Sequence, residues 1–181
     1  DLNKPYRGWK ATFFEGGTRV PFFMQLPGVI APGSQFTAPV SHFDIFATSA
    51  ALAGVQPPAD RVIDGVNLIP FARGEQVGRP HEQMFWRSGA YQVARSGDWK
   101  LQVNQTQDKL WLFNLQDDPT EQHNLVDAEP ARVKELLAQL AEFNSQQKAP
   151  LWPSLVEAPI LIDKPLNRPQ TADDEFIYWS N

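Results

Sequence analysis

The chain has 181 residues, of which 42% are hydrophobic and 20% are charged, and this composition is typical of a folded domain. Its 16 Lys and Arg against 21 Asp and Glu give a formal charge of −5 without any basic block, which argues against nucleic acid as a partner. No apolar run approaches the roughly 20 residues that span a bilayer, which argues against a membrane partner, and the absence of Cys excludes disulfides and thiolate metal sites within the chain.

Residues 1–79 begin with a segment that is dense in glycine, aromatic and charged side chains, as in a loop from the middle of a protein. We therefore expect that part of the protein lies upstream of it. An apolar run over residues 20–26 follows, with Pro21 near its start and Pro27 directly after it. Prolines at both ends of a short apolar run are typical of a buried strand, which is our prediction here.

A helix is predicted after the turn at Pro32 and Gly33. Ser41 and Asp44 have the spacing of a capping box, and Gly54 ends the pattern that follows, so the predicted helix has about twelve residues. The residues at helical spacing, which we expect to form one buried face, are Phe43, Phe46, Ala47, Ala50 and Ala51.

Residues 80–148 are predicted to form a small antiparallel sheet covered by one helix. Aromatic and β-branched residues occur in short runs there, separated by turn formers such as Gly89 and Gly97. The predicted strands are residues 83–87, 91–95, 99–104 and 110–115. A single sheet needs a cover on one face, which an amphipathic helix over residues 130–146 is expected to provide. Its apolar stripe consists of Val133, Leu136, Leu137, Leu140 and Phe143.

Residues 149–181 contain five prolines, which exclude a regular helix through this segment. The runs 160–162 and 176–179 would expose large apolar side chains if the segment were a free tail. We therefore expect an extended C-terminal strap that lies across the rest of the molecule or across a further domain.

The densest cluster of chemically interesting residues lies near the start of the chain. Adjacent glycines at Gly16 and Gly17 let the backbone approach a ligand or a neighbouring chain closely. Glu15 and Arg19 are spaced so that they can pair across this turn and hold the loop in place. Lys10 is a compact cation beside it, and the residue pattern alone leaves open whether this lysine binds an anion or only lies at the surface.

This cluster resembles a segment of the sulfatases of the alkaline-phosphatase superfamily. Residues 8–21 match the pattern G-x-K-x-x-x-x-E-G-G-x-R-V-P, and further agreement follows in order at residues 64–68, 95–101 and 112–125. The resemblance covers about residues 8 to 145. Leu26 stands where the family usually has tryptophan, and Ala47 where many members have proline.

The resemblance implies a hydrolase that cleaves sulfate esters with a formylglycine nucleophile near a bound Ca²⁺ or Mg²⁺. The formylglycine motif C/S-x-P/A-x-R does not occur in this chain, so we expect the nucleophile and the metal ligands upstream of Asp1. Only Lys10 matches an active-site position of the family, where the resemblance implies a catalytic and substrate-binding lysine. A sulfated small molecule or glycan substrate and a periplasmic or extracellular location are implied in the same way.

The predicted fold is therefore α/β: the end of a sulfatase catalytic domain in residues 1–79, the sheet and helix in 80–148, and the strap in 149–181. Two other readings of the function remain open at this point. One is a phosphate or phosphonate ester hydrolase with a different upstream nucleophile, and the other is a catalytically inactive structural or interaction module.

Other residues of the sequence are weaker candidates for a functional role. His42, His81 and His123 have no metal-ligand spacing and are predicted to be structural or surface residues. Arg7 and Trp9, beside the loop that carries Lys10, are candidates for the rim of a pocket.

Overall fold

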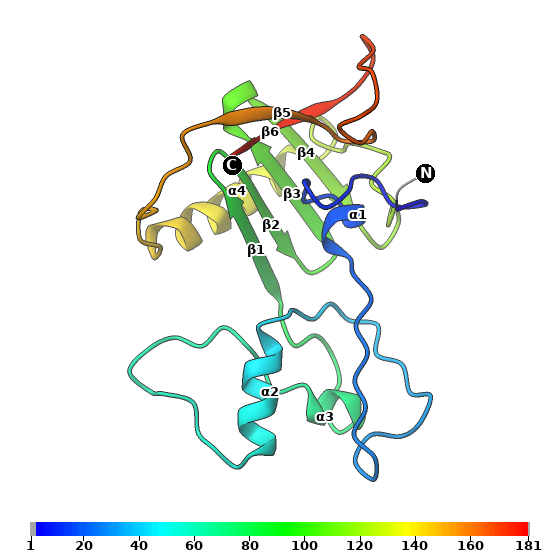
Figure 1. The fold of residues 1–181 in the computed structure, drawn as a ribbon, viewed down its shortest axis with the longest axis vertical. Coiled ribbons are helices and arrows are strands. Elements are labelled where there is room, and N and C mark those ends of the chain that lie inside the picture. Colours follow the sequence, from blue (N-terminus) through cyan, green and yellow to red (C-terminus); the bar gives the residue numbers. More distant parts are fainter. Residues whose placement is uncertain (1–2, 181) are drawn as a thin grey trace. The chain divides into compact units, whose positions relative to one another are not determined.

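A computed structural model describes residues 3–180 of the chain (Figure 1). The chain divides into two compact units. One contains the residues up to Pro21 together with the chain from Gln83 onwards, and the other is Phe22–Glu82. None of the helices in the described residues is long and apolar enough to cross a membrane. The predicted three-part division at residues 79/80 and 148/149 stays a prediction.

The first unit is built on a four-stranded antiparallel sheet with its strands in sequence order. The strands are β1 (Gln83–Ser88), β2 (Tyr91–Ser96), β3 (Trp99–Asn104) and β4 (Lys109–Asn114). Gly89 and Gly97 have positive φ in the two tight turns, as such hairpins require. The sequence prediction of this meander is confirmed to within one residue at each strand end.

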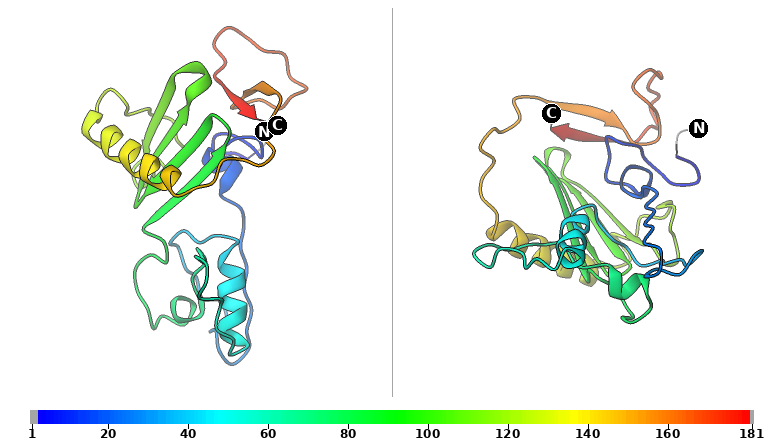
Figure 2. Two further views of the ribbon diagram at one scale, coloured as in Figure 1. Left: turned by 90° about the vertical axis from the view of Figure 1, so that its left-hand side faces the viewer. Right: turned by 60° about the horizontal axis from the view of Figure 1, so that its bottom comes forward.

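Helix α4 (Pro130–Ser145) covers one face of the sheet, as predicted (Figure 2). The buried contacts come from Val133, Leu136 and Leu140 of the helix and from Ala94, Leu101, Val103 and Leu112 of the sheet. Phe143 stacks on Phe85 of β1 with the ring centroids 4.4 Å apart. Leu137 is wrongly placed in the predicted stripe, since it is 37% exposed. It directly follows Leu136, and consecutive side chains of a helix point about 100° apart.

The opposite face of the sheet is covered by the two ends of the chain. The C-terminal segment forms strands β5 (Glu157–Leu161) and β6 (Phe176–Ser180), which pair with each other as an antiparallel ribbon. Figures 1 and 2 show this ribbon, in orange and red, beside the blue N-terminal segment on the face opposite α4. The core on this side contains Trp9, Phe14, Tyr91, Val93, Trp111, Phe113, Leu115, Ile160, Ile162 and Ile177. The predicted extended strap is thus confirmed, and its two apolar runs pair with each other.

The second unit contains α2 (Asp44–Leu52) and the short α3 (Ile69–Ala72). The capping-box pattern is half formed, because the Asp44 carboxylate accepts a hydrogen bond from the Ser41 amide at 2.7 Å and no side chain caps the helix in return. The predicted apolar face is wrong in part, since Phe43 and Phe46 are 38% and 53% exposed. The buried face of α2 instead includes Asp44, whose carboxylate also accepts a hydrogen bond from the Val66 amide at 2.8 Å.

The strand predicted over residues 20–26 is wrong. These residues belong to no helix or sheet, and Val20 and Phe23 are 74% and 91% exposed. A strand is stable only when its backbone groups pair with a neighbour, and none of the strands between residues 3 and 180 pairs with this segment. Pro21 and Pro27 also lack the N–H groups that such pairing needs.

Candidate functional site

Lys10 lies at the tip of a tight turn whose two ends are buried. The turn is closed by a hydrogen bond of 2.8 Å from the Thr12 amide to the Trp9 carbonyl, and the Trp9 amide donates to the Thr12 hydroxyl at 3.2 Å. Trp9 is 8% exposed and Thr12 is 1% exposed, whereas Lys10 is exposed. The ammonium group is therefore presented to the outside by a backbone segment that is fixed on both sides.

The two predicted close-approach glycines lie directly behind this turn. Gly16 and Gly17 belong to the single helical turn α1 (Glu15–Thr18). A Cβ atom on Gly17 would lie 2.0 Å from the Thr12 carbonyl oxygen and 2.4 Å from the Trp9 carbonyl oxygen, distances that no side chain tolerates. The glycine pair thus lets the backbone of α1 pack against the backbone that carries Lys10, as the sequence predicted.

A buried ion cluster lies beneath the turn. The Lys100 ammonium is fully buried and lies 2.8 Å from Glu15 Oε1 and 3.0 Å from Glu121 Oε1. The sequence suggested a pair between Glu15 and Arg19, but Glu15 pairs with Lys100 instead. Glu15 points into the core while Arg19 stacks over the ring of Tyr6 at 4.8 Å.

The cluster continues to β2 through two further side chains. Gln102 Nε2 donates to Glu121 Oε1 at 3.1 Å, and the Tyr91 hydroxyl donates to Gln102 Oε1. The Tyr91 hydroxyl also accepts a hydrogen bond of 3.0 Å from the Phe13 amide. Burial, as the main cause, raises the pKa of Tyr91 well above its usual value, so this hydroxyl keeps its proton.

The pKa values of the two carboxylates in the cluster are shifted in opposite directions. Burial raises the pKa of Glu121 above its usual value, and the charge of Glu15 adds to this effect against the attraction of Lys100. Burial also disfavours ionised Glu15, but the charge and hydrogen bond of Lys100 outweigh it and lower the pKa of Glu15. Glu15 is therefore the carboxylate that holds its negative charge most firmly beside the single buried ammonium group.

Arg7 and Trp9 anchor the turn to the C-terminal ribbon. Arg7 forms ion pairs with Asp163 at 2.9 Å and with Glu175 at 2.6 Å, and Trp9 Nε1 donates to the Leu161 carbonyl at 2.9 Å. Both side chains are largely buried by these contacts. The structure thus gives them an anchoring role, and the predicted pocket rim stays a prediction.

Glu175 is the centre of this anchor. Its carboxylate accepts hydrogen bonds from Lys109 at 2.6 Å, from Arg7 at 2.6 Å and from Trp111 Nε1 at 3.2 Å. Partial burial favours the neutral acid, but these three donors outweigh it and lower the pKa of Glu175 from 4.5 to about 2. The ionised form is therefore the one that holds the ribbon in place.

Replacing Glu175 with glutamine is expected to lower the unfolding free energy at pH 7 by about 1 to 2 kcal/mol, since the site is partly screened by solvent. The folded pKa lies below the unfolded one, so the stabilisation is complete above about pH 4.5 and is lost as the pH falls toward 2. Thermal melts of both proteins between pH 7 and 3 measure this difference. As a control, Glu135→Gln removes an exposed pair with Arg132 and should change stability by less than about 0.5 kcal/mol. A Glu175→Gln difference that stays constant over this pH range would show that charge is not its cause.

The histidines take structural or surface positions. His81 Nε2 lies 2.8 Å from Asp44 Oδ1, so it helps to fix the start of α2. His123 is exposed beside Asp118, whose carboxylate accepts a hydrogen bond from the His123 backbone amide. Within residues 3–180, no three or more His, Asp or Glu side chains are grouped so that they could hold a metal ion.

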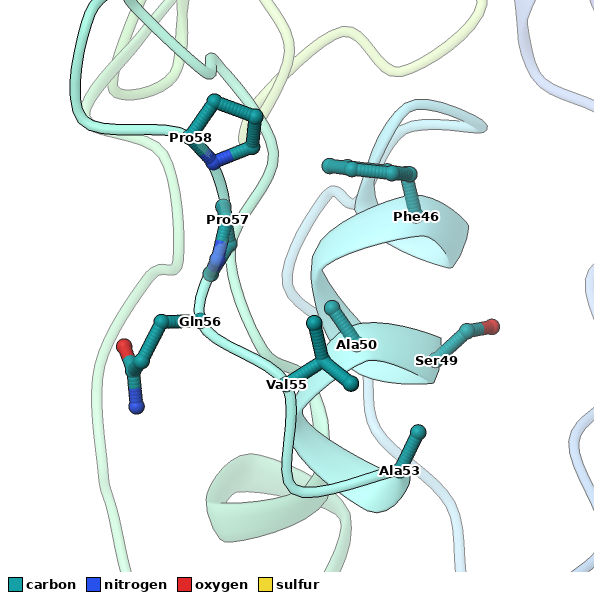
Figure 3. Close-up of a pocket in the computed structure, with 8 residues that line it drawn as sticks. All are labelled: Phe46, Ser49, Ala50, Ala53, Val55, Gln56, Pro57 and Pro58. Carbon is teal, nitrogen blue, oxygen red and sulfur yellow. The ribbon is translucent and has the colours of Figure 1, made fainter.

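A hollow of about 340 Å³ lies beside α2 in the second unit (Figure 3). It is lined by Phe46, Ser49, Ala50, Ala53, Val55, Gln56, Pro57 and Pro58. No lining side chain carries a charge or titrates near neutral pH, so the hollow offers no group for acid–base chemistry. The turn of Lys10 remains the candidate functional site.

Sequence analysis missed the side chains that hold this turn. Tyr91, Lys100, Gln102 and Glu121 were assigned no role in it, although all four are essentially unexposed. The available signal was the spacing of Lys100 and Gln102, which are two residues apart and so point to the same face of a strand with a core on both sides.

The family follows from comparison with known proteins. Residues 7–149, which include the Lys10 turn and its buried cluster, match the profile of a sulfatase family described as N-sulphoglucosamine sulphohydrolase, C-terminal. The chain belongs to this sulfatase family. It is 41% identical to rat steryl-sulfatase over 117 residues, which make up 65% of this chain and 20% of the rat enzyme. It is 39% identical to mouse N-acetylgalactosamine-6-sulfatase over 102 residues, or 56% of this chain and 19% of that sulfatase.

Solved structures agree with this assignment. The crystal structure of Ps i-CgsB superposes with a TM-score of 0.72 and 28% identity, over 83% of this chain and 34% of that protein. The same protein has been solved in complex with k-i-k-neocarrahexaose. The predicted resemblance to sulfatases and the predicted α/β fold are thereby confirmed. This sulfatase chain spans a fifth to a third of the length of these relatives.

Proposed function

We propose that this chain is the carboxy-terminal part of an enzyme that hydrolyses sulfate esters, and that Lys10 binds the sulfuryl group. The observation that carries the proposal is the exposed ammonium group on a turn fixed by glycine contacts and a buried ion cluster, within the segment that matches the sulfatase family. A lysine is suited to this role because its compact cation offers three hydrogen-bond donors to anionic oxygens.

The chemistry requires that negative charge on the sulfuryl oxygens and on the leaving oxygen be stabilised as the ester bond breaks. Donors that are already fixed in place do this at little cost, because they need not reorient during the reaction. The buried ends of the Lys10 turn provide such fixation. We infer that Lys10 holds the sulfuryl oxygens and assists departure of the alcohol.

The formylglycine nucleophile and a Ca²⁺ or Mg²⁺ ion belong, in this proposal, to polypeptide outside the chain. The relatives are three to five times as long as the segment they share with it, which leaves room for both. The acidic residues between positions 3 and 180 form no cluster that fits such an ion. When bound, the metal would supply further positive charge to the sulfuryl group.

A sulfated small molecule or a sulfated glycan is the proposed substrate. Two observations support this class. Relatives are named for a steryl substrate and for an N-acetylgalactosamine 6-sulfate substrate, and Ps i-CgsB was solved with an oligosaccharide.

The proposal is tested by comparing the 181-residue chain with the complete polypeptide on an aryl sulfate. The complete protein should hydrolyse the ester, whereas the chain alone should show no turnover and no stoichiometric tight Ca²⁺ binding. An aryl phosphonate serves as the control substrate for the complete protein and should be hydrolysed more slowly. Metal-dependent turnover by the chain alone, or a preference for the phosphonate, would contradict the proposal.

A further inference from the structure

Two backbone amides, those of Phe13 and Glu15, hold the segment that follows the Lys10 turn, and both donate to side chains from the sheet unit. The Phe13 amide donates to the Tyr91 hydroxyl at 3.0 Å, and the Glu15 amide donates to Glu121 Oε2 at 2.5 Å. Gln102 joins the two acceptors, because its Oε1 accepts a hydrogen bond from the Tyr91 hydroxyl and its Nε2 donates one to Glu121. A single hydrogen-bond chain thus fixes residues 13 and 15, three and five positions after Lys10.

This hydrogen-bond chain is buried, so its polar groups lose their contact with water. Tyr91, Gln102 and Glu121 are each unexposed, and Phe14 between the two held amides packs against Trp111 and Phe113. Buried polar groups cost desolvation, and replacing a whole buried network by apolar residues is often neutral or stabilising. Such a network fixes the relative positions of the groups that it joins, because each hydrogen bond requires a particular distance and angle.

The ion cluster around Lys100 fixes the position of the Glu121 carboxylate. Lys100 balances Glu15 and Glu121 at 2.8 and 3.0 Å, so the carboxylate that accepts the Glu15 amide is itself held from the other side. Glu121 has φ of 58°, a left-handed backbone conformation that costs energy in a residue with a side chain. The backbone conformation of the loop that carries Glu121 therefore places the carboxylate of this residue within reach of the Glu15 amide and of Lys100.

We propose that Tyr91, Gln102 and Glu121 are positioning residues that set the place of the Lys10 ammonium group through the backbone of residues 12–15. The inference rests on the proposed function of Lys10 and adds how that function is built. The three residues touch no substrate and act only through the turn.

The test is a double-mutant cycle in the complete enzyme with an aryl sulfate as substrate. Tyr91→Phe keeps the ring that packs on Phe13 at 4.8 Å and removes only the hydroxyl. It is expected to lower kcat about tenfold with KM within about twofold, because a displacement of about 1 Å at a catalytic group has effects of this order or larger. Tyr178→Phe, a ribbon tyrosine outside the network, should leave kcat unchanged within about twofold.

The decisive readout is the effect of Tyr91→Phe in a Lys10→Ala background. If Tyr91 acts through Lys10, the second substitution should lower kcat by less than about twofold there, because the group that it positions is already absent. A merely structural role would give the same tenfold loss in both backgrounds, and that result overturns the inference. Full activity of Tyr91→Phe overturns it as well.

Two further arms complete the test. Gln102→Met removes the hydrogen bonds between Tyr91 and Glu121 with a side chain of similar size, and the same dependence on Lys10 is expected for it even if Tyr91→Phe fails to fold. If Gln102→Met and Lys10→Ala act additively, the inference fails while the proposed function stands. If Lys10→Ala alone keeps full kcat, the proposed function fails, and the inference fails with it.

Discussion

Replacing Lys10 with alanine in the complete enzyme is expected to lower kcat by about 10²- to 10³-fold, or roughly 3 to 4 kcal/mol. The substitution removes a fixed cation at the place where charge shifts in the transition state. Stability should hardly change, because the Lys10 side chain is exposed and the turn is held by its neighbours. The measurement is kcat and KM on one aryl sulfate, with thermal melts alongside to exclude misfolding.

Two variants serve as controls for this result. Lys10→Arg should recover only part of the activity, because a planar guanidinium does not fit a site shaped for a compact ammonium group. Lys4 is an exposed lysine near Lys10 that matches no position of the family pattern. The Lys4→Ala variant should therefore keep kcat/KM within about threefold of the wild-type value. Near-normal kcat in a well-folded Lys10→Ala enzyme would make Lys10 an ordinary surface residue.

Replacing Lys100 with methionine is expected to lower the unfolding free energy by about 3 to 5 kcal/mol. Methionine fills a similar volume, but Glu15 and Glu121 are then left buried without a cation. Removing one partner of a buried ion cluster costs far more than the cluster as a whole contributes, because the remaining charge cannot reach water. Chemical denaturation of the wild type and the variant measures the difference.

The matched control is Lys109→Met on the neighbouring strand. Lys109 also pairs with a glutamate, but its side chain is 39% exposed, so its loss should cost less than about 1 kcal/mol. Adding Glu15→Gln and Glu121→Gln to Lys100→Met should restore most of the lost stability, since no uncompensated carboxylate remains. Equal costs for the two lysine substitutions would contradict the assignment of Lys100 to a buried cluster.

The parts of the fold that sequence analysis predicted correctly are those decided by short-range patterns. Turn residues at Gly89 and Gly97 and alternating apolar residues define the meander, and Pro130 marks the first turn of α4. Residues 20–26 have an equally clear local pattern but no strand, because pairing depends on a partner that local sequence does not specify. The buried face of α2 was misjudged for a related reason, since its contacts come from residue 66 and its neighbours.

The candidate site divides in the same way. The Gly16–Gly17 pair and Lys10 were found from a motif within ten residues. Lys100 was not linked to Glu15, because the two are 85 positions apart in the sequence. Proximity in sequence instead favoured Arg19 as the partner of Glu15, although α1 directs the two side chains to different surroundings.

The anchors between Arg7 and the ribbon have a consequence for the order of events during synthesis. Arg7 and Glu175 are 168 positions apart, so at about 5 to 20 residues per second the ribosome needs roughly ten to thirty seconds to supply the second partner after the first. Throughout that interval Arg7 lacks its ion pair with Glu175, although Leu161 and Asp163, the other partners of the Lys10 turn, are made earlier. A message truncated just before the codon for Glu175 would still encode Lys10 and all four strands of the sheet, yet its product would lack the Arg7–Glu175 pair and strand β6.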